Sequence, residues 1–408
     1  MEKMFDSDIC ARCKGRGYCG KPCPILAKFP FLGKPKTHFS GSSPPEIFVG
    51  RVGYPKVNTG ILAPDEYGNT EEYSMPELWH EKNFSIENIL KLRSQLIYAR
   101  FKSQVKDARK EKKFLALMQE ISMADRKVDT EILLKRAPRY IAEINTHSPI
   151  IGNPAPLKAA RLEENPHVNR KVEYLTGDTD VKASLAINEL YKGKIEVSNI
   201  IKVLSAGLLG LGIRRKLVPT RWAITATDDT ISKLLLEKIR YYPEIGEILL
   251  FNSEYLGNHY EFLLLPDKFS FEVIEAKMSG SVWNPFSSRT AIMQDYEQFS
   301  GRKNYADNVT GAYYVNRLAL CEYLEFKKKQ ASCLVMRECR PEYYAPCGVG
   351  ILREASRQAF KNKPETFPSI KQALNTAQTR MRLPISIFSQ QSWLLKEYKK
   401  QTRLNRFF

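Results

Sequence analysis

Residues 246–277 read GEILLFNSEYLGNHYEFLLLPDKFSFEVIEAK and are the most informative segment for the architecture. Apolar and polar residues alternate in three runs, at 249–252, 260–265 and 269–275. A period of two residues is typical of β-strands, because successive side chains point to opposite faces of a sheet. Turn-forming residues at 256–258 and 266–268 separate the three runs. The segment therefore predicts an antiparallel β meander.

The rest of the chain outside its two ends mixes helical spacing with short β-like runs, which predicts an α+β fold, a mixed globular core around the meander. Ser85 is predicted to cap a helix beginning at Ile86, because a serine side chain can accept from the first free N–H groups. Further helices are predicted at 100–113 (as a cationic continuation of that helix), 128–147, 183–213 with a break at Gly193, 229–241 capped by Asp228, and 350–361. Further strands are predicted at 47–52, 57–62, 221–226 and 332–338, with 312–327 left as helix or strand and 148–182 as loop.

Composition and length indicate a packed protein with small additions at both ends. The chain has 408 residues, 43% of them hydrophobic and 26% charged, which excludes a disordered chain, a fibre and a low-complexity scaffold. We predict a cysteine-rich segment and linker at 1–37, an α+β core at 38–395 with a possible subdivision near 148–182, and a flexible tail at 396–408.

The charge is strongly positive, with 63 Lys and Arg against 45 Asp and Glu and a formal net charge of +18. Such an excess favours a polyanionic partner, namely DNA, RNA or an acidic membrane surface, although a generally basic proteome would also explain it. The sequence has no apolar run of 18 residues and its start, MEKMFDSDIC, is no secretory signal. We therefore expect a cytoplasmic protein with no membrane partner.

Four cysteines lie within fourteen residues near the start, Cys10, Cys13, Cys19 and Cys23, with the spacing C-x2-C-x5-C-x3-C. Two close pairs of thiolates can hold a tetrahedral Zn²⁺, and Gly15 and its neighbouring glycines would allow the tight turns around it. Free thiols or an iron–sulfur cluster are the alternatives. We predict a small structural zinc knuckle, since no coordination position is left open for catalysis. The later cysteines have no paired spacing and are interpreted as buried core thiols, Cys321, Cys333, Cys339 and Cys347.

The chain ends in KKQTRLNRFF, in which Gln401, Leu404, Phe407 and Phe408 match the pattern Q-x-x-[aliphatic]-x-x-[aromatic]-[aromatic]. This pattern resembles the peptide by which many replication and repair proteins bind the sliding clamp PCNA. One tight helical turn would bring the apolar side chains to one face, where they could fill a hydrophobic pocket. Packing of the two aromatic rings onto the protein's own core is the alternative. We predict a PCNA-binding tail.

Two interior segments carry candidate phosphate or nucleic-acid contacts. In GRVGYPK, residues 50–56, backbone N–H groups together with Arg51 and Lys56 could face a phosphate, although the segment matches no P-loop and a structural hairpin is the simpler interpretation. Near residue 215 a basic cluster lies beside Trp222, whose ring could stack on a base. The cluster consists of Arg214, Arg215, Lys216 and Arg221.

Catalytic motifs are weak. Asp267, Glu275 and Lys277 imitate the PD…(D/E)xK arrangement of metal-dependent nucleases, in which two carboxylates hold a divalent ion. The gap is short and lies on a predicted hairpin, so exposed turn and strand residues are the preferred interpretation. The segment His259-Tyr260-Glu261 is a still weaker coincidence.

Taken together, these motifs resemble the archaeal Nre family of DNA-repair proteins, NreA type. The resemblance rests on the cysteine spacing, on SPPEIFVGRVGYPKVNTG (residues 43–60), on RKLVPTRWAITATDD (residues 215–229) and on the terminal peptide. It implies a role in the DNA-damage response together with PCNA, and it supplies no catalytic mechanism. It also raises the interest of a set of polar residues in the two interior blocks, namely Arg51, Tyr54, Lys56, Asn58, Lys216, Thr220, Arg221 and Asp228.

Three functions remain open from the sequence. The first is a DNA-binding repair factor recruited by PCNA and carrying structural zinc. The second is an enzyme acting on nucleic acid or a nucleotide, either a metal-dependent nuclease or a phosphate-ligand enzyme. The third is an adaptor that links PCNA to other repair proteins without touching DNA.

Overall fold

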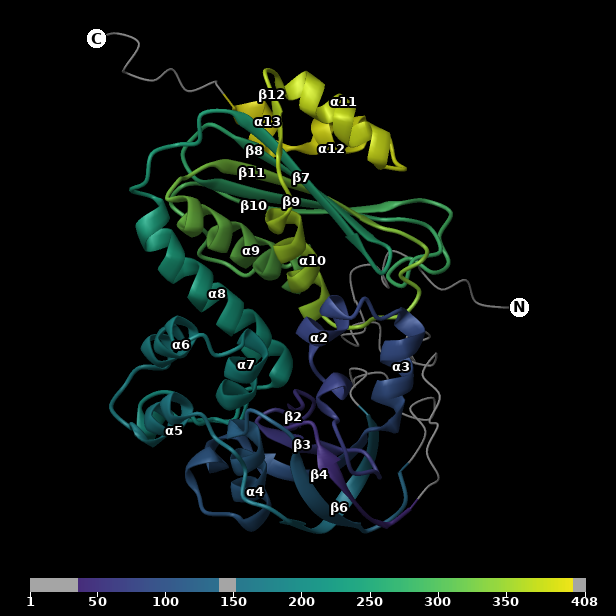
Figure 1. Ribbon diagram of the computed structural model, residues 1–408, viewed down its shortest axis with the longest axis vertical. Coiled ribbons are helices and arrows are strands. Elements are labelled where there is room, and N and C mark those ends of the chain that lie inside the picture. Colours follow the sequence, from purple (N-terminus) through teal and green to yellow (C-terminus); the bar gives the residue numbers. More distant parts are fainter. Residues whose placement is uncertain (1–35, 139–151, 399–408) are drawn as a thin grey trace. The chain divides into compact units, whose positions relative to one another are not determined.

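The computed structural model describes residues 36–138 and 152–398, and these residues form the predicted α+β fold (Figure 1). They divide into two compact units. Unit 2 comprises the described residues up to 231 and residues 345–347. Unit 1 comprises residues 232–344 and 348–398. The boundary falls within the helix α8 (Thr220–Ile239), whereas residues 148–182 lie inside unit 2.

Unit 2 is built on a six-stranded mixed sheet with the order β1-β5-β6-β4-β3-β2. The strands are β1 (His38–Ser43), β2 (Glu46–Val49), β3 (Lys56–Ala63), β4 (Ile97–Gln104), β5 (Val128–Leu134) and β6 (Asn153–Leu162). The two edge strands β1 and β2 are consecutive in the chain, and the Ser43 hydroxyl donates to the Leu62 carbonyl at 2.7 Å. The sheet therefore curls, and its inner face packs on Leu115, Met118 and Ile121 of α4 (Lys113–Met123).

Besides α4, the described part of unit 2 has the helices α2 (Pro76–Glu81), α3 (Ile86–Gln95), α5 (Arg170–Gly177), α6 (Ala183–Lys192) and α7 (Val197–Ser205). Of these, α3 and α5 begin at side-chain caps. Ser85 caps α3 as predicted, since its hydroxyl accepts from the Asn88 N–H while the Asn88 side chain accepts from the Ser85 N–H. The predicted break at Gly193 separates α6 from α7.

Unit 1 is a second six-stranded sheet, with the order β10-β9-β11-β8-β7-β12, covered on both faces (Figure 1). Its strands are β7 (Ile248–Tyr255), β8 (Asn258–Leu265), β9 (Ser270–Lys277), β10 (Ala291–Glu297), β11 (Ser332–Cys339) and β12 (Glu365–Phe367). One face carries α9 (Gly311–Lys327) and α10 (Gly350–Lys361), and the other carries α11 (Ile370–Arg380), α12 (Ser386–Gln391) and α13 (Trp393–Glu397). This coverage explains why β8 and β11 are buried along their whole length.

The predicted meander is confirmed for β7 and β8 and is wrong for the third strand. β7 and β8 pair antiparallel, but β11 lies between β8 and β9, antiparallel to the former and parallel to the latter. The insertion follows from burial, because the apolar strand β11 (SCLVMREC) takes a central position with both faces covered.

Three predicted elements are wrong. Residues 97–104 and 128–134 are strands β4 and β5 where helices were predicted, and residues 221–226 belong to helix α8 where a strand was predicted. In β5 the buried and half-buried residues alternate strictly, which is a period of two. In α8 the buried residues Ala223, Thr227 and Ile231 recur every fourth position, which is a helical period. Asp228 is therefore inside α8 and is no helix cap.

Residues 148–182 also contain more order than the predicted loop, since β6 and α5 lie there. The described residues contain no helix of sufficient length and apolar character to span a bilayer. The cysteine cluster at 10–23, the helix predicted beyond 138 and the tail residues from 399 lie outside the described residues.

Candidate nucleic-acid interface

The two interior blocks singled out in the sequence meet in unit 2. The Val49 N–H, at the end of β2, donates to the Thr220 hydroxyl at 2.9 Å, and the same hydroxyl lies 3.0 Å from that of Ser205 on α7. Beyond this junction the Tyr54 and Trp222 rings contact one another, with centroids 5.3 Å apart and planes tilted by 50°. Thr220 thus positions the first turn of α8 against the β2–β3 hairpin.

The turn between β2 and β3 holds Tyr54 by backbone geometry. The Gly50 N–H donates to the Asn58 carbonyl at 2.8 Å, and the Lys56 N–H donates to the Gly53 carbonyl at 2.9 Å. Gly53 has φ of +79°, and a Cβ there would lie 2.9 Å from the Lys56 carbonyl oxygen. Only glycine fits this turn without strain, and the turn directs Tyr54 toward Trp222.

Both rings remain available to solvent. Tyr54 is 49% exposed and Trp222 is 46% exposed, although each ring already contacts the other. Large aromatic side chains on a folded surface usually bury more of their area, and an exposed ring offers a π-face on which a base can stack. We call Tyr54 and Trp222 the aromatic pair.

Cationic and amide side chains line the strands beside the aromatic pair. Lys56 pairs with Gln104 and Asn58 pairs with Lys102 in the antiparallel register of β3 and β4. These four residues share one sheet face, and both lysines are exposed. Lys56 and Lys102 are diagonal neighbours on this face, about 7–8 Å apart. The surface therefore combines stacking rings with ammonium groups.

Several predicted site residues do not join this surface. The Arg215 guanidinium donates to the carbonyl oxygens of Gly210, Thr176 and Asp178 at 2.5–2.8 Å, so it holds loops together. Asp228 is completely buried inside α8. The short segments that carry Arg109 and Arg214 are joined to each other, because the Arg109 guanidinium donates to the carbonyl of Ile213, the residue before Arg214, at 2.5 Å.

The remaining basic candidates differ in their exposure: Arg51 and Arg221 are half-buried, whereas Lys216 is exposed. Arg221 precedes Trp222 in that turn and is half-buried. Lys216 is exposed, and the neighbouring Leu217 N–H donates to the Val105 carbonyl at 2.8 Å. Arg51 is half-buried in the β2–β3 turn beside the aromatic pair.

The structure does not bring the three weak catalytic candidates together. Asp267 lies in the turn before β9, whereas Glu275 and Lys277 lie near the far end of that strand. Glu275 is about 16 Å from Ser270, the first residue of β9, at ~3.3 Å per residue. Glu275 and Lys277 are completely buried, so the interpretation of these two as exposed strand residues is wrong. Glu275 forms ion pairs with Lys277, at 3.4 Å, and with Arg337. No group of three His, Cys, Asp or Glu side chains among residues 36–138 and 152–398 could hold a metal ion.

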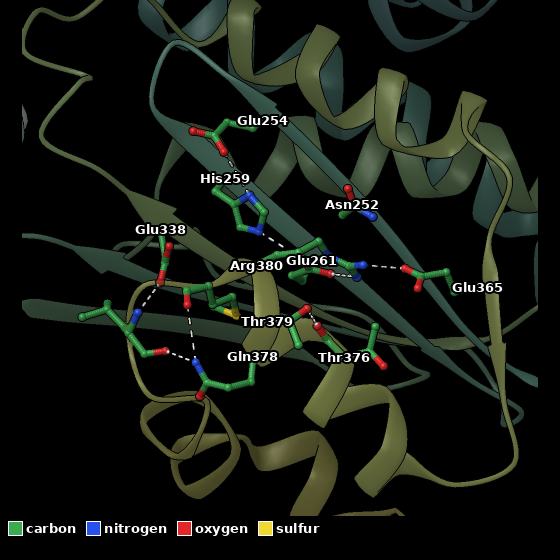
Figure 2. Close-up of polar contacts among 12 residues, drawn as sticks. Asn252, Glu254, His259, Glu261, Glu338, Glu365, Thr376, Gln378, Thr379 and Arg380 are labelled. Atoms are coloured by element: carbon green, nitrogen blue, oxygen red, sulfur yellow. Dashed lines mark hydrogen bonds and ion pairs between the residues drawn. The ribbon is translucent and has the colours of Figure 1, made fainter.

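A buried polar network lies on the face of the unit 1 sheet that carries α11 (Figure 2), and the sequence indicated it only through the weak coincidence at His259-Tyr260-Glu261. His259 lies between two carboxylates, with Nε2 3.0 Å from Glu261 Oε1 and Nδ1 3.4 Å from Glu254 Oε2. Arg380, at the end of α11, donates to both oxygens of Glu261 at 2.8 and 2.9 Å and to Glu365 at 2.7 Å. The available signal was the i, i+2 spacing of His259 and Glu261, which places both on one face of a strand.

This network fastens helices to the sheet, as the contacts drawn in Figure 2 show. Glu338, on β11, accepts from the Leu383 N–H at 2.7 Å and from Arg340 at 2.9 Å. The Arg340 guanidinium also donates to the Arg380 carbonyl at 2.8 Å, at the end of α11. We interpret the network as structural.

The described cysteines bear out the prediction of core thiols in large part. Cys321, Cys333 and Cys339 are completely buried, and burial raises the pKa of each thiol. Cys347 is only partly buried, which differs from the prediction, although burial of its thiol raises its pKa to about 12. These thiols are protonated at neutral pH and are poor nucleophiles.

Comparison with known proteins places most of the chain in one family. The family models described as "Archaeal Nre, N-terminal" and "Archaeal Nre, C-terminal" match residues 18–284 and 297–407. A protein named DNA repair protein NreA from Archaeoglobus fulgidus is 39% identical over 91% of this chain and 93% of its own length. DNA repair protein NreB from the same organism is 35% identical over 96% of this chain and 98% of its own length.

A third relative, from Haloferax volcanii, is also named DNA repair protein NreA and is 35% identical over 80% of both chains. No solved structure matches the chain. Because the two family models together cover most of the sequence and the relatives align over nearly their full length, the chain belongs to the archaeal Nre family.

Proposed function

We propose that this chain is a DNA-repair factor that binds DNA through the aromatic pair and the lysines beside it, and that PCNA recruits it through the C-terminal peptide. The observation that carries the proposal is the exposed contact between Tyr54 and Trp222 next to Lys56 and Lys102. The names of the relatives, DNA repair proteins NreA and NreB, support the biological setting.

The chemistry of the surface favours DNA with unpaired bases. Stacking of one base on an aromatic side chain contributes about 1–3 kcal/mol, whatever the base. Each ammonium group that contacts a phosphate releases a condensed counterion, which makes binding salt-dependent. A ring can reach a base face only where the base is unstacked, so single strands, gaps and damaged duplex are the preferred partners. The net charge of +18 supports attraction to the phosphate backbone.

The experiment that tests this proposal compares Trp222→Ala with the wild-type chain in titrations of a labelled single strand and a labelled duplex. We expect Trp222→Ala to weaken single-strand binding about tenfold, since one stacking contact is lost, and Trp222→Phe to restore most of it. Tyr174→Ala is the matched control, because Tyr174 is also an exposed ring of unit 2, on α5, and lies outside the aromatic pair.

A change in salt dependence separates stacking from charge. Lys56→Gln with Lys102→Gln should lower the slope of log affinity against log salt by about 0.7 for each lost phosphate contact, whereas Trp222→Ala should leave the slope unchanged. Single-strand affinity equal in Trp222→Ala and Tyr174→Ala would refute the aromatic pair as the DNA surface. Absence of any DNA binding by the wild-type chain would favour an adaptor that bridges PCNA and other repair proteins.

The zinc knuckle belongs to the same proposal. Four thiolates from Cys10, Cys13, Cys19 and Cys23 form a complete donor set for a tetrahedral structural Zn²⁺, and zinc in such sites contributes directly to folding. Metal analysis of the purified chain should find about one zinc per chain, which Cys10→Ser with Cys13→Ser should remove and Cys347→Ser should not. Iron in place of zinc would correct the metal.

A further inference from the structure

At one end of unit 1 the last turn of α8, the β8–β9 turn and the end of α9 lie side by side (Figure 1). Gln330, just after α9, joins them. Its side-chain amide donates to the Tyr242 carbonyl at 2.7 Å, and its side-chain oxygen accepts from the Phe269 N–H at 3.1 Å. Lys238 and Glu325 add an ion pair of 3.6 Å between the two helices.

These segments, together with Phe299 in the turn after β10, present rings and cations to solvent. The rings are highly exposed for their size, with Tyr241 at 89%, Phe326 at 79% and Phe299 at 40%. We call the set of three rings and three cations the basic–aromatic end, and it consists of Arg240, Tyr241, Lys268, Phe299, Phe326 and Lys327.

Each cation of the set lies beside a ring. The Arg240 guanidinium and the Lys268 ammonium lie 5.6 and 5.8 Å from the centroid of Phe299, and the Lys327 ammonium lies 5.5 Å from that of Phe326. Such contacts restrict long flexible side chains, so the cations are positioned before any partner arrives. Interleaved rings and cations are the pattern of surfaces that track single strands.

Charge at this end is positive overall, because residues 238–242, 266–269 and 325–330 hold six Lys and Arg against two carboxylates, Asp267 and Glu325. Glu325 is engaged by Lys328 at 2.7 Å, by Lys238 at 3.6 Å and by the Tyr242 hydroxyl at 2.9 Å. Helix dipoles also favour cations at the ends of α8 and α9. The dipoles do not account for Lys268, which lies in a turn between strands, or for the three exposed rings.

We propose that the basic–aromatic end binds single-stranded nucleic acid as a second contact, carried by unit 1 and distinct from the aromatic pair of unit 2. This extends the proposed function, because it predicts that one strand engages both units. Phosphates would pair with Arg240, Lys268 and Lys327, and bases would stack on the exposed rings. An acidic protein segment would also suit the charge, but it would leave the rings without planar partners.

The test uses the full chain and a labelled oligo-dT of about 40 nucleotides, long enough for two contacts at ~4–16 nucleotides each. Phe326→Ala with Lys327→Gln should lower affinity about tenfold and reduce the salt slope by about 0.7, because one ring and one phosphate contact are lost. Lys361→Gln is the matched control, since Lys361 is exposed at the end of α10 and belongs to neither surface. Photocrosslinking of a 5-iodouracil strand should mark a peptide that contains Tyr241 or Phe326.

Each outcome bears on the proposal. Affinity, slope and crosslinks of the double variant equal to those of Lys361→Gln would overturn it. Loss of poly-glutamate binding with retained oligo-dT binding would overturn it in favour of an acidic protein partner. Parallel titration of Trp222→Ala separates the two surfaces. If only the Phe326→Ala, Lys327→Gln variant binds more weakly, the aromatic pair is refuted as a DNA surface and this proposal stands. If only Trp222→Ala binds more weakly, the aromatic pair stands and this proposal is refuted.

Discussion

Lys202, on α7 in unit 2, carries a buried amine on which the carboxylates of Glu46 and Glu77 act. Burial lowers the pKa of Lys202 to about 8, while the charges of Glu46 and Glu77 act in the opposite direction. Between pH 8 and the usual lysine value the unfolded chain therefore binds more protons than the folded chain, so this group makes the free energy of unfolding rise with pH over that window. Lys202→Met lacks this contribution.

We expect the unfolding free energy of wild type minus that of Lys202→Met to increase by about 1–2 kcal/mol between pH 7.5 and pH 9.5, as measured by urea unfolding. Taking the difference between the two chains is essential. Burial raises the pKa of Cys321 and Cys333, and both chains lose stability through those thiols at alkaline pH. A difference that stays constant from pH 7.5 to 9.5 would show that Lys202 titrates normally.

For single residues, the sequence predicted site residues well where the type of side chain indicates its role. It predicted them poorly where the role depends on whether the side chain is buried in the fold. Tyr54 and Trp222 were identified as parts of two separate blocks, but their contact depends on the hydrogen bond between Val49 and Thr220, whose positions differ by 171. Arg215 and Asp228 were predicted site residues because of their charge. In the structure Arg215 donates to backbone carbonyl groups, and Asp228 is buried. Charge in a sequence does not distinguish a binding side chain from a structural one.

Among the elements, α11 depends on the ion pair between Arg380 and Glu261. Glu261 is completely buried on β8, so removing the Arg380 guanidinium would leave this carboxylate inside the protein beside the His259 ring, 3.0 Å away. We expect Arg380→Met to lower the unfolding free energy by about 3 kcal/mol in urea. Arg382→Met is the control, because its pair with Glu342 is about half exposed and should contribute less than about 1 kcal/mol.

A double variant tests whether the effect comes from the pair. Glu261→Gln with Arg380→Met removes both charges, so its loss should be clearly smaller than the sum of the two single losses. Additive losses, or equal effects of Arg380→Met and Arg382→Met, would mean that α11 is held mainly by its apolar contacts. Those contacts place Ala373 and Ala377 against the sheet.

Element prediction succeeded where one period dominated a segment. The run that became α10 has a clear period of 3.6 residues, and the runs that became β7 and β8 are bounded by turn-forming residues. It failed at β4, where IYARFKSQ mixes cations with aromatics, because an exposed face of a strand and an exposed face of a helix are both charged. The position of β11 between β8 and β9 could not be predicted, since strand order depends on which strands the helices cover.

For the whole molecule, the two compact units carry different surfaces. The aromatic pair lies in unit 2 and the basic–aromatic end in unit 1, whereas the sequence predicted one core from 38 to 395. The division falls within α8, where no proline, glycine or polar linker marks it. Linker composition is the usual sequence signal for a domain boundary, and a continuous helix conceals the boundary from it.

The terminal peptide provides a prediction that separates recruitment from DNA binding. Gln401, Leu404, Phe407 and Phe408 lie at the end of the chain, and none of them belongs to either proposed DNA surface. Phe407→Ala with Phe408→Ala should therefore abolish binding to immobilised PCNA and leave the affinity for free single-stranded DNA unchanged. Trp222→Ala should have the opposite effects, and both variants should bind more weakly than wild type to DNA that carries a loaded clamp, because the two contacts act together. If PCNA binding survives the double change at the terminus, the resemblance to a clamp peptide is coincidental, and PCNA recruitment would require another surface.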